Sequence, residues 1–265
     1  MEEADLQPHR SRYWLTPPPD DPEAFEAKVR EVCATYEQAA SAHAQGIHVV
    51  SCDEKTGIQA LERLHPTLPM QRGEVERREF EYVRHGTQTL IASMAVATGE
   101  LVAPSVGPTR TEADFAAHVA GVVATAPNDA WIFVCDQLNT HQSEALVRLV
   151  AAREGRAEEL GVKGVSGVLH TLATRAAYLS DPSHRIRFVY TPKHTSWLNQ
   201  VEIWFSILAR RLLKRASFVS ADDLRARLLA FIDYFNRTLA KPFRWTYRGR
   251  PLRACSRTDT SAVVY

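Results

Sequence analysis

Two short apolar runs, each followed directly by an aspartate, constrain the fold of this chain more than any other feature. GIHVVSC (46–52) precedes Asp53 and the polar turn EKTG, and WIFVC (131–135) precedes Asp136. Short runs rich in β-branched and aromatic residues are typical of buried strands. Ligands of an open α/β sheet gather beyond the carboxyl ends of its strands, so both aspartates occupy positions typical of a functional site.

The two runs also predict how their side chains are arranged. If the strands are neighbours, the alternation of side chains places Asp53 beside Asp136 and turns Cys52 and Cys135 toward the opposite, core side. The four cysteines of the chain lie far apart, without a CxxC motif or a Cys/His pairing. We therefore expect reduced, mostly buried thiols rather than a zinc site or a disulfide framework.

The remaining patterns predict a mixed five-stranded sheet with helices on both faces. Residues 87–106 contain two β-rich runs around TGE, which is typical of a hairpin, and 185–192 is another β-rich run. The Gly-punctuated stretch 153–184 predicts a helical insertion before the last strand. A buried parallel strand needs a crossover helix to return in the same direction, which favours the α/β class. Helices are predicted at 22–43, 111–126, 139–152, 198–215 and 221–239.

Three segments are expected along the chain. Residues 1–45 form an N-terminal linker and helix, because the consecutive prolines of TPPPDDPEAF forbid a helix before about residue 22. Residues 46–240 form the α/β domain. Residues 241–265 form a basic C-terminal tail.

The sequence lacks the features of a membrane protein. No window approaches the roughly 18–20 uncharged apolar residues that a membrane span needs. The start, MEEADLQPHRSRYW, has no apolar core of the kind found in a signal peptide. We therefore expect a cytoplasmic protein with no membrane partner.

Charge is distributed unevenly along the chain. Residues 1–184 carry a net charge of −10 and residues 185–265 carry +11, although the whole chain has a net charge of only +1. A basic segment of this kind favours a polyanionic partner. The alternative is that the two parts neutralise each other within the fold.

Glu202 is a candidate third acid that would complete a metal site with Asp53 and Asp136. Two adjacent carboxylates repel unless a cation lies between them, and hard oxygen donors suit magnesium or manganese. Glu202 lies in the first turns of a helix that follows strand 185–191, and Asn199 on the same helical face could orient it or a bound phosphate. Two metal ions about 4 Å apart can activate a water or a 3′-hydroxyl and stabilise the leaving oxygen of a phosphoryl transfer.

Three blocks of sequence carry a specific resemblance. HVVSCDEKTGIQALERLHPTLP, WIFVCDQLNTHQS and FVYTPKHTSWLNQVEIWFSIL resemble the three acidic blocks of bacterial insertion-sequence transposases of the family numbered 630, in the mariner superfamily. The similarity covers about residues 45–253. It implies an RNase H-like fold, a DDE triad of Asp53, Asp136 and Glu202, and two magnesium ions. It also implies DNA cleavage followed by strand transfer, which in this group usually occurs at a TA dinucleotide.

The chain differs from that family in two respects. Relatives normally carry paired helix-turn-helix domains ahead of the catalytic domain, whereas only about 45 residues precede the first strand here. We therefore expect the product of a split or frameshifted gene, with a separately encoded helix-turn-helix portion, or a truncated element. Asp136 and Glu202 are 66 residues apart, about twice the spacing common in the group, and the insertion at 153–184 accounts for the excess.

The resemblance implies DNA as the partner, both element ends and target, with a homodimer on DNA and association with the bacterial nucleoid. Alternatives to DNA contact are helix capping for Asn139, a surface position for His141, and solvated positions for the loop and helix cations. Glu54 is expected to form a salt bridge rather than to bind metal. The candidate DNA contacts are Asn139, His141, Lys193, His194, Asn199, Arg210, Arg211, Lys214 and Arg215.

Two other functions are compatible with these sequence features. One is an RNase H-like nuclease that cuts DNA without joining it. The other is a non-catalytic DNA-binding remnant of a transposase, which has kept the fold without its chemistry.

Overall fold

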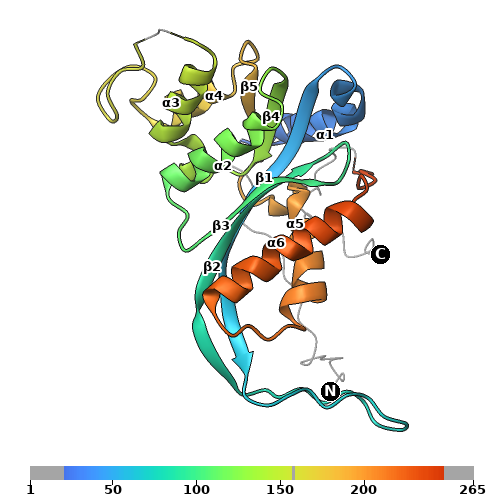
Figure 1. Ribbon diagram of the computed structural model, residues 1–265. Coiled ribbons are helices and arrows are strands. Elements are labelled where there is room, and N and C mark those ends of the chain that lie inside the picture. Colours follow the sequence, from blue (N-terminus) through green and yellow to red (C-terminus); the bar gives the residue numbers. More distant parts are fainter. Residues whose placement is uncertain (1–20, 157–158, 248–265) are drawn as a thin grey trace, which may run out of the picture.

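The computed structural model of the protein describes residues 21–156 and 159–247 (Figure 1). Most of the predicted N-terminal linker lies outside these residues. The same is true of the larger part of the predicted basic tail, which includes the fourth cysteine, Cys255.

A five-stranded mixed sheet organises the chain and confirms the predicted α/β, RNase H-like class. Its spatial order is β3-β2-β1-β4-β5. The pairs β1/β2 and β2/β3 are antiparallel, whereas the pairs β1/β4 and β4/β5 are parallel. The strands are β1 (Ile47–Arg63), β2 (Tyr82–Ala95), β3 (Leu101–Gly107), β4 (Ala130–Cys135) and β5 (Ile186–Tyr190).

Helices cover both faces of the sheet, as predicted (Figure 1). Helices α2, α3 and α4 pack with Cys52, Phe133 and Cys135 on one face, while α1 packs with Val49 and Val134 on the other. Helices α5 and α6 cover the antiparallel part of the sheet. None of the described helices is both long and apolar enough to cross a membrane. The helices are α1 (Pro22–His43), α2 (Glu112–Ala124), α3 (Glu144–Arg153), α4 (Leu172–Leu179), α5 (Val201–Leu208) and α6 (Ala221–Thr238).

Local capping explains where several helices begin. Asp21 accepts a hydrogen bond from the Ala24 amide at the start of α1, and Ser220 caps α6 in the same way. Thr111 and Asp114 form a reciprocal capping box at the start of α2. Each cap satisfies an amide that has no partner within its helix.

Two predicted helices differ from those observed. Residues 139–152 were expected to form one helix, but Asn139–Gln142 is a 3-10 turn and Ser143 caps α3 after it. The predicted helix 198–215 is divided into a 3-10 turn at Ser196–Leu198, the regular helix α5, and a π-helical turn at Ala209–Leu213. Short 3-10 and π segments of this kind often lie beside functional sites.

The first strand is longer than predicted. The polar turn expected after Asp53 does not end it, because β1 continues to Arg63 against β2 and Asp53 pairs with Ala92. Gly57, with a φ of 63°, lies instead where the register shifts between Lys55 and Ile58. Asp53 therefore lies within β1, at the level where its parallel partner β4 ends.

The described part of the insertion before the last strand contains the short helix α4 and glycine-rich turns. Arg175 on α4 is buried and donates hydrogen bonds to the carbonyls of Gln142 (2.7 Å) and Leu169 (2.9 Å). These bonds join the insertion to the turn that follows Asp136. The predicted helical insertion is thus part of the packing around the second acid.

An arm of residues 64–81 joins β1 to β2 and projects away from the body of the protein (Figure 1). Two isolated bridges, Leu68 with Arg77 and Gln71 with Glu74, hold its strands together. Met70, along with other apolar side chains of the arm, is exposed. The sequence patterns did not predict this arm.

The turn between β2 and β3 gives a test of this packing. Gly99 has a φ of 79°, and a Cβ added to it would lie 2.0 Å from the carbonyl oxygen of Lys241. Gly73, at the tip of the arm, has a similar φ of 83° but nothing within 4 Å. We expect Gly99→Ala to lower the free energy of unfolding by about 2–4 kcal/mol, against at most about 1 kcal/mol for the control Gly73→Ala. Equal effects in urea unfolding would contradict the observed contact.

Candidate active site

Asp53 and Asp136 lie side by side, as predicted. Ser51 pairs with Val134 in the parallel register of β1 and β4, so the two aspartates occupy the next equivalent positions on the same face. Burial raises the pKa of Asp53 to about 7, a hydrogen bond from the Glu54 amide opposes the rise, and the charge of Asp136 adds to it. The pair is therefore electrostatically strained when both acids are ionised.

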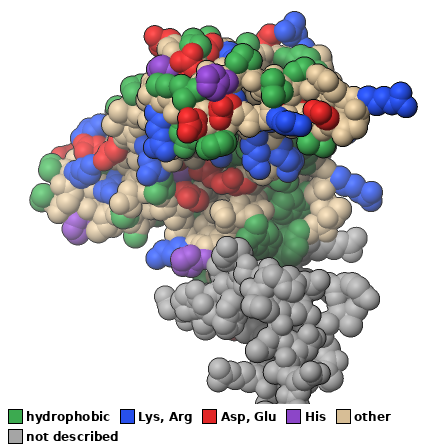
Figure 2. All heavy atoms as spheres, turned by 90° about the horizontal axis from the view of Figure 1, so that it is seen from below, with side chains coloured by type: hydrophobic (Ala, Val, Ile, Leu, Met, Phe, Trp, Pro, Cys, Tyr) green, Lys and Arg blue, Asp and Glu red, His purple; other side chains and the backbone are tan. Residues whose placement is uncertain are grey.

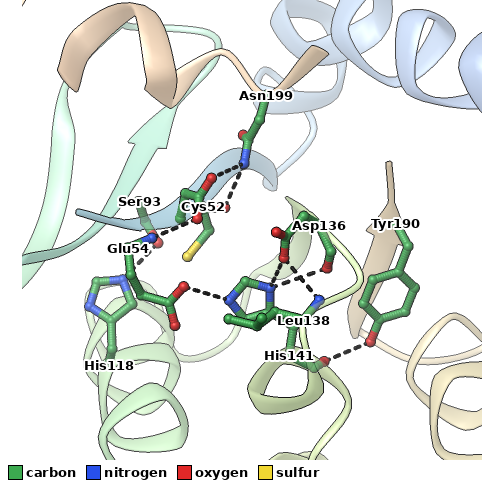
Figure 3. A network of polar contacts seen from close by, with 10 residues as sticks. Cys52, Glu54, Ser93, His118, Asp136, Leu138, His141, Tyr190 and Asn199 are labelled. Carbon is green, nitrogen blue, oxygen red and sulfur yellow. Dashed lines mark hydrogen bonds and ion pairs between the residues drawn. The ribbon is translucent and has the colours of Figure 1, made fainter. Parts of the chain in front are cut away.

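Asn199 fastens the start of α5 to β1 beside Asp53 (Figure 3). Its Nδ2 donates hydrogen bonds to the Cys52 carbonyl (2.9 Å) and to Asp53 Oδ2 (3.2 Å). The Ser51 hydroxyl donates to Asn199 Oδ1 and accepts from the Val201 amide at 2.9 Å. The side chains of Ser51 and Asn199 are buried, so these bonds fix the entry of α5 relative to the strand.

Glu202 directly follows this anchored segment. It lies in the first turn of α5, and its side chain is exposed. Among residues 21–156 and 159–247, no three His, Cys, Asp or Glu side chains are grouped as a metal site. The structure thus brings Asp53 and Asp136 together and anchors the helix of Glu202 beside them, while the complete triad stays a prediction.

A buried ion-pair chain supports Asp136 from the other side (Figure 3). His141 Nδ1 lies 2.7 Å from Asp136 Oδ1, and His141 Nε2 lies 3.1 Å from Glu54 Oε2. Burial lowers the pKa of His141, but its bonds to Asp136, Cys135 and Glu54 outweigh burial and raise that pKa well above its usual value. Burial likewise raises the pKa of Asp136, yet the hydrogen bond and charge of His141 leave it lowered. Asp136 is therefore the acid that stays ionised.

Two predicted DNA contacts do not fit the structure. The side chains of His141 and Asn199 are fully buried and bonded to the acids, so neither can reach DNA in this conformation. His141 was expected on the surface, but the 3-10 turn after Asp136 directs it into the core. The expected salt-bridge role of Glu54 is confirmed by its contact with His141.

The other candidate DNA contacts are exposed. His194 has a φ of 63°, a strained conformation that is common at functional sites, and it precedes the anchored segment of α5. Seen from below, acidic side chains gather near the middle of the protein surface and Lys and Arg side chains lie around them (Figure 2). The exposed candidates are Asn139, Lys193, His194, Arg210, Arg211, Lys214 and Arg215.

Comparison with known protein families identifies the chain. The family model described as DDE superfamily endonuclease matches residues 48–225. The chain belongs to this family. The matched range contains Asp53, Asp136 and Glu202, and the match confirms the DDE endonuclease part of the resemblance.

Solved structures of the Mos1 mariner transposase are similar to this DDE endonuclease at low sequence identity. Against the Mos1 paired end complex with Mn, identity is 11% and the TM-score 0.48, covering 88% of this chain and 60% of that chain. Against a pre-cleavage Mos1 transpososome, the identity is 12% and the TM-score 0.49, and the match covers 88% of this chain and 60% of that chain. Against the Mos1 catalytic domain, the identity is 10% and the TM-score 0.44, and the match covers 83% of this chain and 85% of that chain. The chain thus spans 60% of the length of the first two, and a search of curated proteins found no significant match.

The acids of this DDE endonuclease fit a divalent cation. Two carboxylates lie side by side, and burial has raised the pKa of Asp53 to about 7. A cation between Asp53 and Asp136 would remove their repulsion, and carboxylate oxygens suit magnesium or manganese. These two residues would hold the ion, with Glu202 as the expected third ligand.

The pKa of Asp53 predicts how stability depends on pH without a cation. Because this pKa is about 7 in the folded protein and about 4 in the unfolded chain, its contribution to stability is full below pH 4 and is lost as pH rises to 7. Asp53→Asn removes the titrating group. In EDTA, we expect the free energy of unfolding of Asp53→Asn, relative to wild type, to rise by about 1–3 kcal/mol between pH 5 and pH 8.

The control is Asp222→Asn, which changes an exposed aspartate of α6. Its difference from wild type should stay constant over the same pH range. A constant difference for Asp53→Asn as well would contradict the strained carboxylate pair.

Proposed function

We propose that this DDE endonuclease is the catalytic domain of a bacterial insertion-sequence transposase of the family numbered 630. It would cut DNA at the ends of the element and join those ends to target DNA. The observation that carries the proposal is the pair Asp53 and Asp136, set side by side within the range that matches the DDE family. The basic residues 185–265, with a net charge of +11, support a DNA substrate.

The roles of the residues follow from their contacts. Asp53, Asp136 and Glu202 would hold two magnesium ions, for which manganese can substitute, and the ions when bound activate the attacking oxygen and stabilise the leaving oxygen. Asp136 would supply an ionised carboxylate, because its hydrogen bond and ion pair with His141 lower its pKa. Asn199 donates to Asp53 Oδ2 and so orients that carboxylate. The start of α5, which the Val201 amide anchors to Ser51 of β1, would bring Glu202 toward the same side of this strand.

The exposed cations would hold the DNA backbone. Lys193 and His194 lie in the loop before Glu202, where they can meet the phosphates of the strand that is cut. The basic turn after α5 can follow the same strand, since phosphate contacts position DNA without reading its sequence. Pairing of two element ends would take a homodimer on DNA. The site of action would be the cytoplasm, at the nucleoid.

Product analysis tests this function. Precleaved duplexes that copy the DNA flanking the gene are incubated with the protein, a plasmid target and Mg²⁺. We expect joined products, and we expect Asp53→Ala, Asp136→Ala and Glu202→Ala each to lower their yield on the order of a thousandfold or more while DNA binding persists. Asp222→Ala, on the surface of α6, is the control and should leave the yield unchanged.

The alternatives give different results in the same experiment. Hydrolysis of the duplexes without joining would show a nuclease. DNA binding with no reaction, unaffected by the three substitutions, would show a non-catalytic remnant.

A further inference from the structure

The buried side chain of His141 connects Asp136 to Glu54, which lies on the face of β1 opposite to Asp53. Its ring lies between Asp136 (Nδ1 to Oδ1, 2.7 Å) and Glu54 (Nε2 to Oε2, 3.1 Å) (Figure 3). The side chains of His141 and Glu54 are 0% and 1% exposed. Neither can touch DNA or a metal ion held between Asp53 and Asp136, so their effect on the site must pass through Asp136.

Three elements fix the position of this ring. The Phe115 ring of α2 packs against it with centroids 4.3 Å apart. The Tyr190 hydroxyl of β5 donates to the His141 carbonyl at 2.8 Å, and Arg175 of α4 donates to the next carbonyl, that of Gln142, at 2.7 Å. The core therefore sets the orientation of His141 independently of solvent or ligand.

The hydrogen bonds of His141 determine which oxygen of Asp136 is available. Nδ1 must carry a hydrogen to donate toward Asp136, and Nε2 carries one when Glu54 is ionised. Asp136 Oδ1 forms an ion pair with His141 Nδ1, which also bonds to the Asp136 carbonyl oxygen at 3.1 Å, and Oδ1 accepts a hydrogen bond from the Leu138 amide at 3.0 Å. With Oδ1 held twice, the second oxygen of Asp136 is left to face a ligand shared with Asp53.

Among the described residues, His141 is the one observed ion partner of Glu54. Its Oε1 is buried and makes no hydrogen bond within the described residues, so His141 is its observed ion partner. A buried carboxylate is costly unless it is paired. This cost keeps the His141 ring turned so that Nε2 faces Glu54 and Nδ1 faces Asp136.

We infer that Glu54 and His141 are positioning residues for Asp136, which hold one of its carboxylate oxygens so that the other faces the catalytic cation. The inference rests on the proposed function, because it assigns a role toward the metal ion of that site. Hydrogen-bond partners of metal ligands typically contribute 10–100-fold to metal affinity.

Titration of the purified full chain with Mn²⁺, followed by electron paramagnetic resonance of the free ion, tests the inference. His141→Phe keeps a ring against Phe115 but removes both donors, and we expect it to raise the Mn²⁺ dissociation constant about 10–100-fold. His141→Asn returns a donor near the place of Nδ1 and should restore most of the affinity. Equal affinity for wild type and His141→Phe would overturn the inference.

Two further variants separate a positioning role from a loss of folding. His141→Phe alone leaves the Glu54 carboxylate buried without its ion partner, which destabilises the fold. The double variant Glu54→Leu with His141→Phe removes both charged groups and is measured together with the single variant. It should bind Mn²⁺ as weakly as His141→Phe while melting close to wild type. His85→Phe breaks another His–Glu pair, with Glu62 at 2.7 Å, and should leave Mn²⁺ affinity unchanged.

A measurement without metal is independent of the proposed function. In ¹⁵N NMR spectra of the metal-free protein, His141 Nδ1 should carry a hydrogen, and Glu54→Gln should change the Nε2 signal. A ring with its hydrogen on Nε2 alone would overturn the inference. If wild type binds no Mn²⁺, or if Asp136→Asn binds as tightly as wild type, the proposed function fails as well. If only the His141 variants bind normally, the positioning role alone fails.

Discussion

Repulsion between Asp53 and Asp136 is the constraint on which the site depends. The parallel register of β1 and β4 forces the two carboxylates onto the same face at the level where β4 ends. Burial of Asp53, with the added charge of Asp136, raises the pKa of Asp53 to about 7. The fold holds this unfavourable pair in place because the strands that carry it are secured by a large buried core. A cation bound between the two carboxylates would remove this repulsion.

The alternation of side chains along β1 distributes the supporting residues to the two faces of the sheet. Ser51 and Asp53 face the start of α5, where Asn199 bonds to both. Glu54 points to the other face and meets His141. Strand β1 therefore contacts both supports of the site: on one face Asn199, which anchors the helix of Glu202, and on the other His141, which pairs with Asp136.

The sequence predicted the parts of this structure that depend on local patterns. The apolar runs before Asp53 and Asp136 predicted their strands and their side-by-side position, and the capped helices begin close to where they were expected. The length of β1 was not predictable, because the EKTG stretch has the composition of a turn and remains extended only through pairing with β2. The burial of His141 and Asn199 depends on contacts between segments 87 and 146 residues apart in sequence, for which a single sequence offers no local signal.

The central claim is that Asp53, Asp136 and Glu202 hold the catalytic cations of this DDE endonuclease. The most direct measurement is the anomalous difference density of a crystal grown with Mn²⁺. We predict a peak that bridges Asp53 and Asp136 at about 2.0–2.3 Å from a carboxylate oxygen of each, with Glu202 turned toward it or toward a second peak about 4 Å away. Density for Mn²⁺ elsewhere on the protein, with none between Asp53 and Asp136 at millimolar Mn²⁺, would contradict the claim.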